Sequence, residues 1–430
     1  MVRIKNILKI VGAFFVLLLF FFFFENKGLA LERVELAQYG STEMDSIENT
    51  LKRAFDNLDG KKLVIPSQKI SFDNLDILGK KNFEIEFLQG GELRCKNFRI
   101  IDCAKFSFHG LNLKGTKEKF SCFDVIGNCY DFSIYDCFFD SEKDSLGQNT
   151  FYGIHVRANW HMKNRKYQNS PRRFRIYNNV VRNTKYDGIL VHANCSDFVI
   201  EDNVVDSAKC IGIEVEGRYG GWKNTTVQPC KNVLIQNNKL KDCGDWGILL
   251  MWTDSVRVYD NISKNAKGCF LSIGCSHLEV KRNELDGLAK GFEISQEFYD
   301  TEKGINSGVL VEDNIIVAKP RAERRGVVDV RHARNVAMKN NKIKCLGRAK
   351  SACLSVVSSQ DVQIVENEFE SKENIPYRVM LDEALDPETK KETKSLNVKN
   401  VDLRKNIYRG VPEKNEIMLE NLKDRKCHIE

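Results

Sequence analysis

The middle of the chain repeats one short pattern. An alternating apolar stretch is followed by Asn, a second short stretch, a Gly and a third alternating stretch, as in FRIYNNVVRNTKYDGILVH (174–192) and NVLIQNNKLKDCGDWGILLM (232–251). Such alternation indicates strands with one buried face. The Asn recurs as Asn179, Asn203, Asn238, Asn261, Asn283, Asn314, Asn341, Asn367 and Asn406. A unit of about 22–26 residues, lengthened in places by insertions, is the repeat size of a solenoid, in which each coil completes its neighbour's core.

The recurring Asn suits a corner between strands, because it tolerates a left-handed backbone and can hydrogen-bond to the copies above and below it. Three short strands per unit, no helical period and an Asn corner resemble the right-handed parallel β-helix family. That family includes pectate lyases, polygalacturonases, alginate epimerases and many phage tailspikes. The resemblance covers roughly residues 61–410. It implies an all-β, single-stranded, right-handed parallel β-helix with three strands per turn.

The resemblance also implies an action on polysaccharides, but it names no activity, because one fold hosts many chemistries. Local signatures of the individual families are absent from the sequence. It has no Asp-Pro-His-Asp of alginate epimerases, no Gly-His-Gly of polygalacturonases and no Arg-x-Pro-x-x-Arg of pectate lyases. A calcium-type Gly-Gly-x-Gly-x-Asp repeat is absent too.

Residues 1–30 are predicted to be an export segment. Arg3, Lys5 and Lys9 precede an uninterrupted apolar run over 10–24. The run is long for the apolar core of a signal peptide and short for a spanning helix, which needs about 20 residues. We expect either a cleaved signal peptide or an uncleaved membrane anchor. Both export the remaining chain, which would be secreted, periplasmic or at the cell surface.

After the export segment we expect a cap, a solenoid and a tail. Residues 31–60 should form an N-terminal cap that contains a helix over 45–59. Residues 61–410 should form the β-helix, and 411–430 a C-terminal cap or tail. Caps are needed because the end turn of a solenoid is an open, apolar and unpaired edge.

Charge and cysteine content leave several partners open. The net charge of +7, from 66 basic and 59 acidic residues, permits an anionic partner without demanding one. Lys and Arg are spread evenly and no nucleic-acid reader motif is present, so we expect no nucleic-acid partner. The 14 Cys residues can be disulfides or buried thiols in an exported chain. Cys103 and Cys137 at the Asn corner, and Cys210 and Cys243 before the Gly strand, favour stacked thiols. The oligomeric state stays open.

Aligning the third strands on their glycines orders their side chains into rows. The first and third residues after each glycine are apolar and should point inward: Ile154, Val156, Ile189, Val191, Ile213, Val215, Ile248, Leu250, Phe292 and Ile294. Because side chains alternate along a strand, the second and fourth residues must point outward. These rows read His155, Leu190, Glu214, Leu249, Phe270 and Glu293, and then Arg157, His192, Glu216, Met251, Ser272 and Ser295. With Val327 in the glycine place of the next turn, Asp329 and Arg331 continue the rows.

Five outward residues should converge on one patch about 10 Å long, because neighbouring turns lie about 4.8 Å apart. The candidate catalytic residues are His155, Arg157, His192, Glu214 and Glu216. A plainer interpretation of the same residues is a solvated lattice of ion pairs. Their convergence beside long insertions favours a site.

Five further residues are candidates for substrate binding. Trp160 and Trp222 lie in insertions that follow the first and third of these strands, and indole rings stack on the apolar faces of sugars. Glu293, Asp329 and Arg331 lie further along the same rows and suit a distal subsite.

Two reactions fit the patch. The first removes the proton next to a uronate carboxylate, as in a polysaccharide lyase or C5-epimerase, with His192 or His155 as base and Arg157 as the neutralising cation. The second is glycoside hydrolysis, with Glu214 and Glu216 as the two carboxylates. A non-catalytic, adhesin-like glycan-binding protein is the third alternative. No cofactor is evident, and a Ca²⁺ ion held by the two Glu residues fits the chemistry but has no motif behind it.

Overall fold

The computed structural model describes residues 31–428 except 41–45, 117–120, 142–149, 162–165, 218–227, 296–303, 319–325, 347–351, 372–376, 383–397, 411–416 and 421–426. The predicted export segment, 1–30, lies outside the described residues. Within the described residues, no helix combines the length and the apolar character that crossing a membrane requires.

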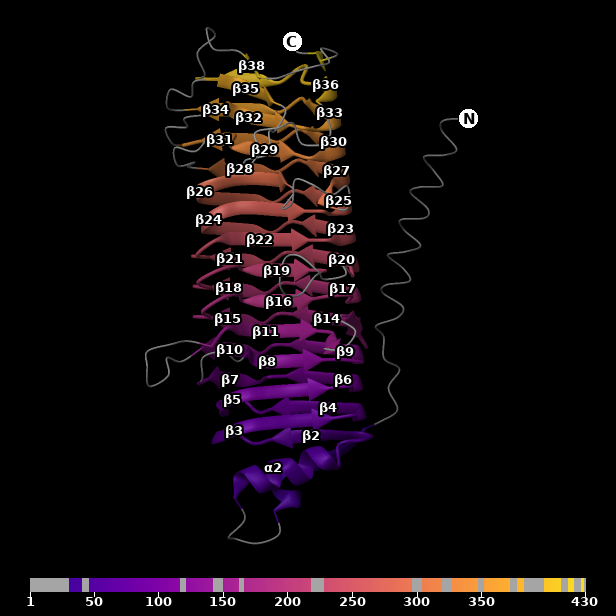
Figure 1. The fold of residues 1–430 in the computed structure, drawn as a ribbon. Coiled ribbons are helices and arrows are strands. Elements are labelled where there is room, and N and C mark those ends of the chain that lie inside the picture. Colours follow the sequence, from indigo (N-terminus) through magenta and orange to yellow (C-terminus); the bar gives the residue numbers. More distant parts are fainter. Residues whose placement is uncertain are drawn as a thin grey trace.

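The chain winds into a column of stacked coils (Figure 1). One coil consists of β14 (Arg172–Tyr177), β15 (Val180–Arg182) and β16 (Ile189–His192), and the next of β17 (Ser196–Glu201), β18 (Val204–Asp206) and β19 (Ile213–Glu216). Each strand pairs in parallel with its equivalent in the next coil. The coils therefore build three ladders, which we call the first, second and third ladders in the order of these strands.

The remaining strands extend the same three ladders. The first ladder also contains β1 (Glu32–Glu35), β2 (Lys61–Ile65), β4 (Lys81–Phe87), β6 (Ala104–His109), β9 (Tyr130–Tyr135), β20 (Cys230–Gln236), β23 (Thr253–Tyr259), β25 (Ser276–Lys281), β27 (Asn306–Glu312), β30 (Ala333–Lys339), β33 (Gln360–Val365), β36 (Lys399–Asp402) and β39 (Cys427–His428). The second contains β7 (Asn112–Gly115), β10 (Phe138–Ser141), β21 (Lys239–Lys241), β28 (Ile315–Ala318), β31 (Lys342–Cys345), β34 (Glu368–Ser371) and β37 (Ile407–Arg409). The third contains β8 (Ser121–Ile126), β11 (Tyr152–Arg157), β22 (Trp246–Met251), β29 (Val328–Arg331), β32 (Ala352–Val357), β35 (Tyr377–Asp382) and β38 (Ile417–Glu420).

Four long strands bend across the second and third ladders: β3 (Lys69–Leu78), β5 (Glu92–Ile101), β24 (Ile262–Ile273) and β26 (Glu284–Ser295). A short antiparallel hairpin of β12 (Asn159–His161) and β13 (Lys166–Gln168) follows β11. The architecture confirms the predicted all-β solenoid with three strands per turn. Strand pairing extends past the predicted limits at both ends, from β1 to β38 and β39.

A short helix closes the N-terminal end of the column (Figure 1). After the 3₁₀ turn η1 (Leu36–Tyr39), α2 (Ile47–Asp56) is capped by Ser46, whose Oγ accepts the Asn49 N–H at 3.2 Å. Leu51 and Phe55 are buried, and the Phe55 ring stacks on Phe98 with centroids 6.0 Å apart. The predicted helix is confirmed, with shorter bounds, and it covers the apolar end of the first coils.

The interior is a continuous apolar core. Every residue predicted to point inward from the third strands is fully buried. Rings also stack from coil to coil, as Phe106, Phe132, Phe174 and Phe198 do at centroid distances of 4.8, 4.8 and 4.6 Å. Each coil thus buries its apolar residues against the coils on either side.

The predicted Asn row is a ladder of buried side chains along one corner. Asn238 donates its N–H and its Nδ2 to Asn261 Oδ1 at 3.0 and 2.9 Å, and Asn261 repeats this to Asn283 at 2.9 and 3.0 Å. The left-handed backbone predicted for these Asn residues belongs instead to the residue before each of them, such as Asp260 with φ 57°. The ladder Asn aligns its amide with the column axis, and its predecessor makes the turn.

Close packing explains the glycine that precedes the third strands. A Cβ atom on Gly188 would lie 2.3 Å from Val205 Cγ1 and 2.8 Å from the carbonyl oxygen of Gly212 in the next coil. Real Cβ atoms do not approach backbone atoms this closely, so a residue without a side chain is required.

The cysteines whose side chains the structure describes are thiols. Thirteen cysteines from Cys95 to Cys353 are free, and all are buried except the partly exposed Cys210. Cys137 stands at the Asn corner, where its N–H donates to Asn179 Oδ1 at 3.1 Å. The prediction for Cys103 is wrong, because Cys103 stands at the corner before the first ladder, where its N–H lies 3.3 Å from Cys129 Sγ. Both corners hold small buried residues, so spacing alone could not distinguish them.

Candidate active site

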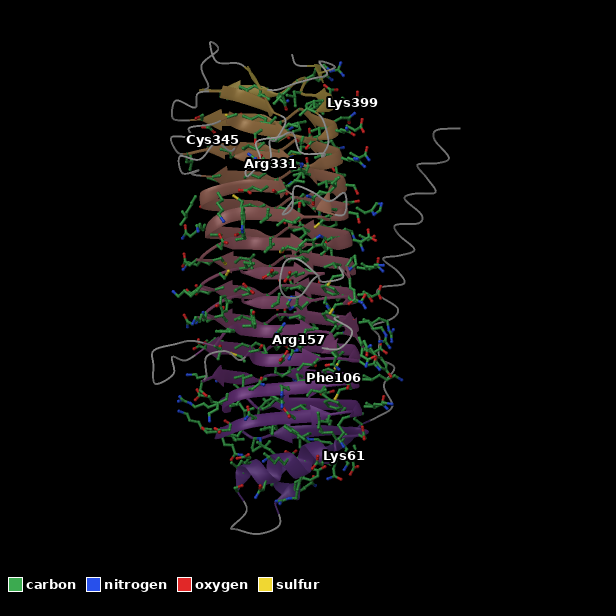
Figure 2. The ribbon with its side chains drawn as sticks, viewed as in Figure 1. Lys61, Phe106, Arg157, Arg331, Cys345 and Lys399 are labelled. Atoms are coloured by element: carbon green, nitrogen blue, oxygen red, sulfur yellow. The ribbon has the colours of Figure 1, made fainter. Side chains whose placement is uncertain are left out.

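The outward side chains of the third ladder form one face of the column, around the Arg157 label in Figure 2. Strand register places Arg157 beside His192 and His192 beside Glu216. In the parallel row, a single residue separates His155 from Glu214. The structure therefore brings the five predicted catalytic residues together on one face.

The predicted outward rows are wrong in one turn. Cys269, rather than Gly268, occupies the glycine place of that coil. Phe270 and Ser272, predicted to point outward, are therefore fully buried, and the residue after each takes the outward place. The physical reason is a pair of register shifts earlier in β24, which lengthen the path to the third ladder.

Arg157 is held by Asp124, a buried carboxylate one coil earlier. Nε and Nη2 of Arg157 donate to the two oxygens of Asp124 at 3.1 and 3.0 Å. Burial raises the pKa of Asp124, and the Arg157 guanidinium opposes that shift. The Arg157 side chain remains 31% exposed. The guanidinium is thus fixed by one carboxylate while part of it faces solvent, an arrangement that can receive a second anion.

His155 has one ring nitrogen engaged. Its Nδ1 lies 3.3 Å from Ser121 Oγ and 3.5 Å from Asp124 Oδ1, and its ring packs on Tyr152 at a centroid distance of 4.8 Å. Nε2 is buried and has no hydrogen-bond partner among the described residues. Burial, reinforced by neighbouring positive charge, lowers the pKa of His155 well below 6.5. The imidazole is therefore neutral at neutral pH, and the Asp124 carboxylate favours a proton on Nδ1, which leaves a lone pair on Nε2.

His192 forms a pair with a carboxylate. Its Nε2 lies 2.9 Å from Glu216 Oε2. The Glu216 side chain is 20% exposed, and that of His192 is 8% exposed. The His155 and His192 rings are tilted by 44°, with centroids 5.7 Å apart. The carboxylate orients the imidazole, so His192 is suited to proton transfer.

Asp187 adds a second carboxyl beside Glu214. It directly precedes Gly188, its Oδ1 accepts the Ile211 N–H at 3.1 Å, and its carboxyl hydrogen-bonds to that of Glu214. Both side chains are more than nine-tenths buried. Burial raises the pKa of Asp187 to about 6. The hydrogen bond with Glu214 opposes this shift, but burial has the larger effect on the Asp187 pKa.

Three of the predicted substrate-binding residues form a separate cluster further along the same face. Glu293 pairs in register with Asp329, which is 1% exposed. Asp329 accepts a hydrogen bond from Arg331 Nε at 2.5 Å and another from Ser355 Oγ. An outer apolar cluster that contains Trp246 lies between these residues and the catalytic candidates.

The two predicted sugar-stacking tryptophans cannot be placed from the described residues. Trp222 lies outside the described residues, as does the side chain of Trp160, whose backbone belongs to the hairpin after β11. Within the described part of the chain, no group of three or more His, Cys, Asp or Glu side chains is arranged to hold a metal ion. The suggested Ca²⁺ ligands Glu214 and Glu216 thus find no third ligand of these types there.

Sequence reasoning missed three residues of the site, Ser121, Asp124 and Asp187. Asp124 continues the row of His155 by one coil, but its strand starts without a glycine, so the alignment on glycine passed over it. Ser121 begins the same strand. Asp187 precedes the strand, where alternation assigns no face. Extending the outward rows one coil backward would have found Asp124.

Comparisons with known proteins bear on the fold. A family model described as a right-handed β-helix region matches residues 225–369. The mannuronan C-5 epimerase AlgE4 A-module of Azotobacter vinelandii is 11% identical, with a TM-score of 0.52 over 91% of this chain and 100% of that chain. A mutant tailspike protein of E. coli bacteriophage HK620, in complex with a pentasaccharide, is 11% identical, with a TM-score of 0.56 over 88% of this chain and 78% of that chain. No curated protein matches the sequence. The chain has the right-handed parallel β-helix fold.

Proposed function

We propose that the protein acts on a uronate-containing polysaccharide and removes the proton next to the uronate carboxylate, as a lyase or a C5-epimerase. This reaction needs a neutral base, a cation that offsets the charge growing on the carboxylate, and an acid. The observation that carries the proposal is His155, a neutral buried imidazole whose Nε2 is uncommitted among the described residues, on the strand that also presents Arg157.

The geometry suggests a role for each group. The solvent-facing part of Arg157 binds the uronate carboxylate, because the two hydrogen bonds to Asp124 already fix the guanidinium. His155 Nε2 accepts the proton. His192, oriented by Glu216, is the second proton-transfer group. In an elimination it protonates the leaving glycosidic oxygen, and in an epimerisation a proton returns to the carbon.

Two further observations support a polysaccharide partner outside the cell. Two of the structural neighbours are a mannuronan epimerase and a pentasaccharide-bound tailspike, and both share the fold with this chain. The basic residues and apolar run of the first thirty residues support export, with the segment either removed or retained as an anchor.

The proposal is tested by incubating the protein with a panel of uronate-containing polymers. Ultraviolet absorbance of unsaturated uronate reports a lyase, and the epimer ratio from NMR reports an epimerase. His155→Ala should slow the reaction by about 100-fold or more, the usual contribution of a general base, with thermal unfolding unchanged. His277→Ala is the matched control, because His277 pairs with Asp254 on the first ladder and its side chain is 76% exposed. Full activity of His155→Ala would end the proposal.

Hydrolysis is a second candidate, favoured by the pKa of Asp187 near 6, which suits a general acid. The contact between Asp187 and Glu214 excludes these two as the catalytic pair, because hydrolases separate their two carboxyls by roughly 5–9.5 Å. New reducing ends without unsaturated product would favour this reaction. Binding of a polymer that is left unchanged would identify a glycan-binding protein instead.

A further inference from the structure

Directly behind the candidate active site, the corner before the first ladder carries two neighbouring cysteines. Lys231 N–H donates to the Cys195 carbonyl at 3.0 Å, so Cys195 and Cys230 are register partners in adjacent coils. Both side chains are fully buried, and the two thiols interact directly with each other. Register partners in parallel strands lie about 4.8 Å apart, which is within the Cα separation of roughly 4.4–6.8 Å that a disulfide spans.

These thiols touch the backbone of the site. Cys195 Sγ lies 3.4 Å from the carbonyl oxygen of His192, and Cys230 Sγ lies 3.6 Å from that of Glu216. His192 and Glu216 are themselves register partners joined by their side chains at 2.9 Å. The two coils are therefore paired twice at this point, by the His–Glu contact on the outer face and by the thiols on the inner side.

We propose that Cys195 and Cys230 form a disulfide when the chain folds in the presence of a disulfide oxidant, and that the bond ties together the two coil corners that carry His192 and Glu216. One thiolate attacks the oxidant disulfide and releases its first thiol. The second thiolate then attacks the mixed disulfide and releases the second thiol. The two cysteines lose two electrons, which reduce the oxidant, and two protons. This inference is independent of the proposed activity.

The bond must form before the coils close. In the folded protein neither thiol is accessible, and burial raises the pKa of Cys195 well above its ordinary value, so little thiolate is present to attack. A protein that has folded reduced should therefore stay reduced when the oxidant is added afterwards. The redox state of the two cysteines is therefore set during folding and does not change in the folded protein.

Mapping the thiols of the full chain tests the proposal. The chain is unfolded, reduced, refolded with either oxidised or reduced glutathione, blocked with N-ethylmaleimide and digested with trypsin. Oxidative refolding should yield a linked pair of the peptides 186–209 and 224–231. Cys275 is the internal control, because Thr253 separates it from Cys230 in the same corner, and it should be recovered blocked. The same mapping on protein produced in a host with an oxidising cytoplasm avoids refolding in vitro.

Stability provides a second readout. The oxidised protein should unfold on the order of 5 °C above the reduced protein, because the bond closes a long loop. This difference should disappear in Cys230→Ser. Recovery of Cys195 and Cys230 as blocked thiols from natively folded protein made under oxidising conditions would overturn the proposal. So would formation of the bond when oxidant is added only after folding, because that would contradict the requirement for closure during folding.

Discussion

Asn261 stands in the middle of the buried Asn ladder, and its replacement by alanine removes five hydrogen bonds at once. The side chain is fully buried. Its Nδ2 donates to the carbonyl oxygens of Ile235 and Tyr259 and to Oδ1 of Asn283, each at 3.0 Å. Its Oδ1 accepts the N–H of Asn238 at 3.0 Å and the Nδ2 of Asn238 at 2.9 Å.

In Asn261→Ala, the buried N–H of Asn238 and the carbonyl of Ile235 lose these partners. Each buried polar group left unsatisfied costs roughly 1–3 kcal/mol, so the free energy of unfolding should fall by about 2–5 kcal/mol. Urea titration followed by circular dichroism measures the change. The control is Asn74→Ala on the exposed side of β3, which should stay within about 0.5 kcal/mol of the wild type. A loss below about 1 kcal/mol in Asn261→Ala would refute the view that the buried amides hold the coils together.

Three further variants test other features. Gly188→Ala should lower the melting temperature, because the new Cβ is forced against Val205 and a backbone carbonyl. Gly40→Ala should leave the melting temperature unchanged, because its Cβ meets nothing closer than 3.5 Å. Equal melting temperatures for the two variants would contradict the role of close packing at Gly188. The hydrogen bond from His109, with Lys62, lowers the pKa of Glu84 from 4.5 to about 2. The stability that Glu84 contributes is therefore present above pH 4.5 and lost as pH falls toward 2. The difference in melting temperature between wild type and Glu84→Gln should consequently shrink from pH 7 to pH 3. A constant difference would contradict the lowered pKa of Glu84. Asp187 has its pKa raised from 3.8 to about 6, so its contribution is present below pH 3.8 and lost as pH rises through 6. Asp187→Asn should consequently melt higher than wild type at pH 8 and nearly equal to it at pH 4, and a lower melting temperature at pH 8 would contradict the raised pKa.

The repeat made most of the fold predictable. Strict alternation and a recurring Asn fix which side chains face inward, because a one-residue slip would reverse every strand. The direction of side chains was predicted wrongly where register shifts changed the number of residues before the strand, as at Phe270 and Ser272 in β24. The role of the Asn was also only half predicted, because the left-handed turn belongs to the preceding residue, such as Asp260.

The site residues could be predicted only in strands that begin with a glycine, because the outward rows were counted from those glycines. His155, Arg157, His192, Glu214 and Glu216 share one face because strand register places them there. Asp124 and Asp187 escaped prediction because the first lies in a strand without a starting glycine and the second lies at a corner. The lowered pKa of His155 and the raised pKa of Asp187 depend on burial by neighbouring side chains. The spacing of residues in the sequence does not predict this burial.

The Asn ladder has a consequence for how the column can change in length. Successive amides are separated by 23 residues from Asn238 to Asn261 and by 22 from Asn261 to Asn283. Deleting one complete coil, from the residue after one ladder Asn through the next ladder Asn, would join two equivalent corners and keep the line of amides continuous. Deleting a single residue within a strand would shift every later side chain of that coil to the opposite face. Proteins with this fold should therefore gain or lose residues as entire coils, or as insertions between strands, while the strands themselves keep their residue count.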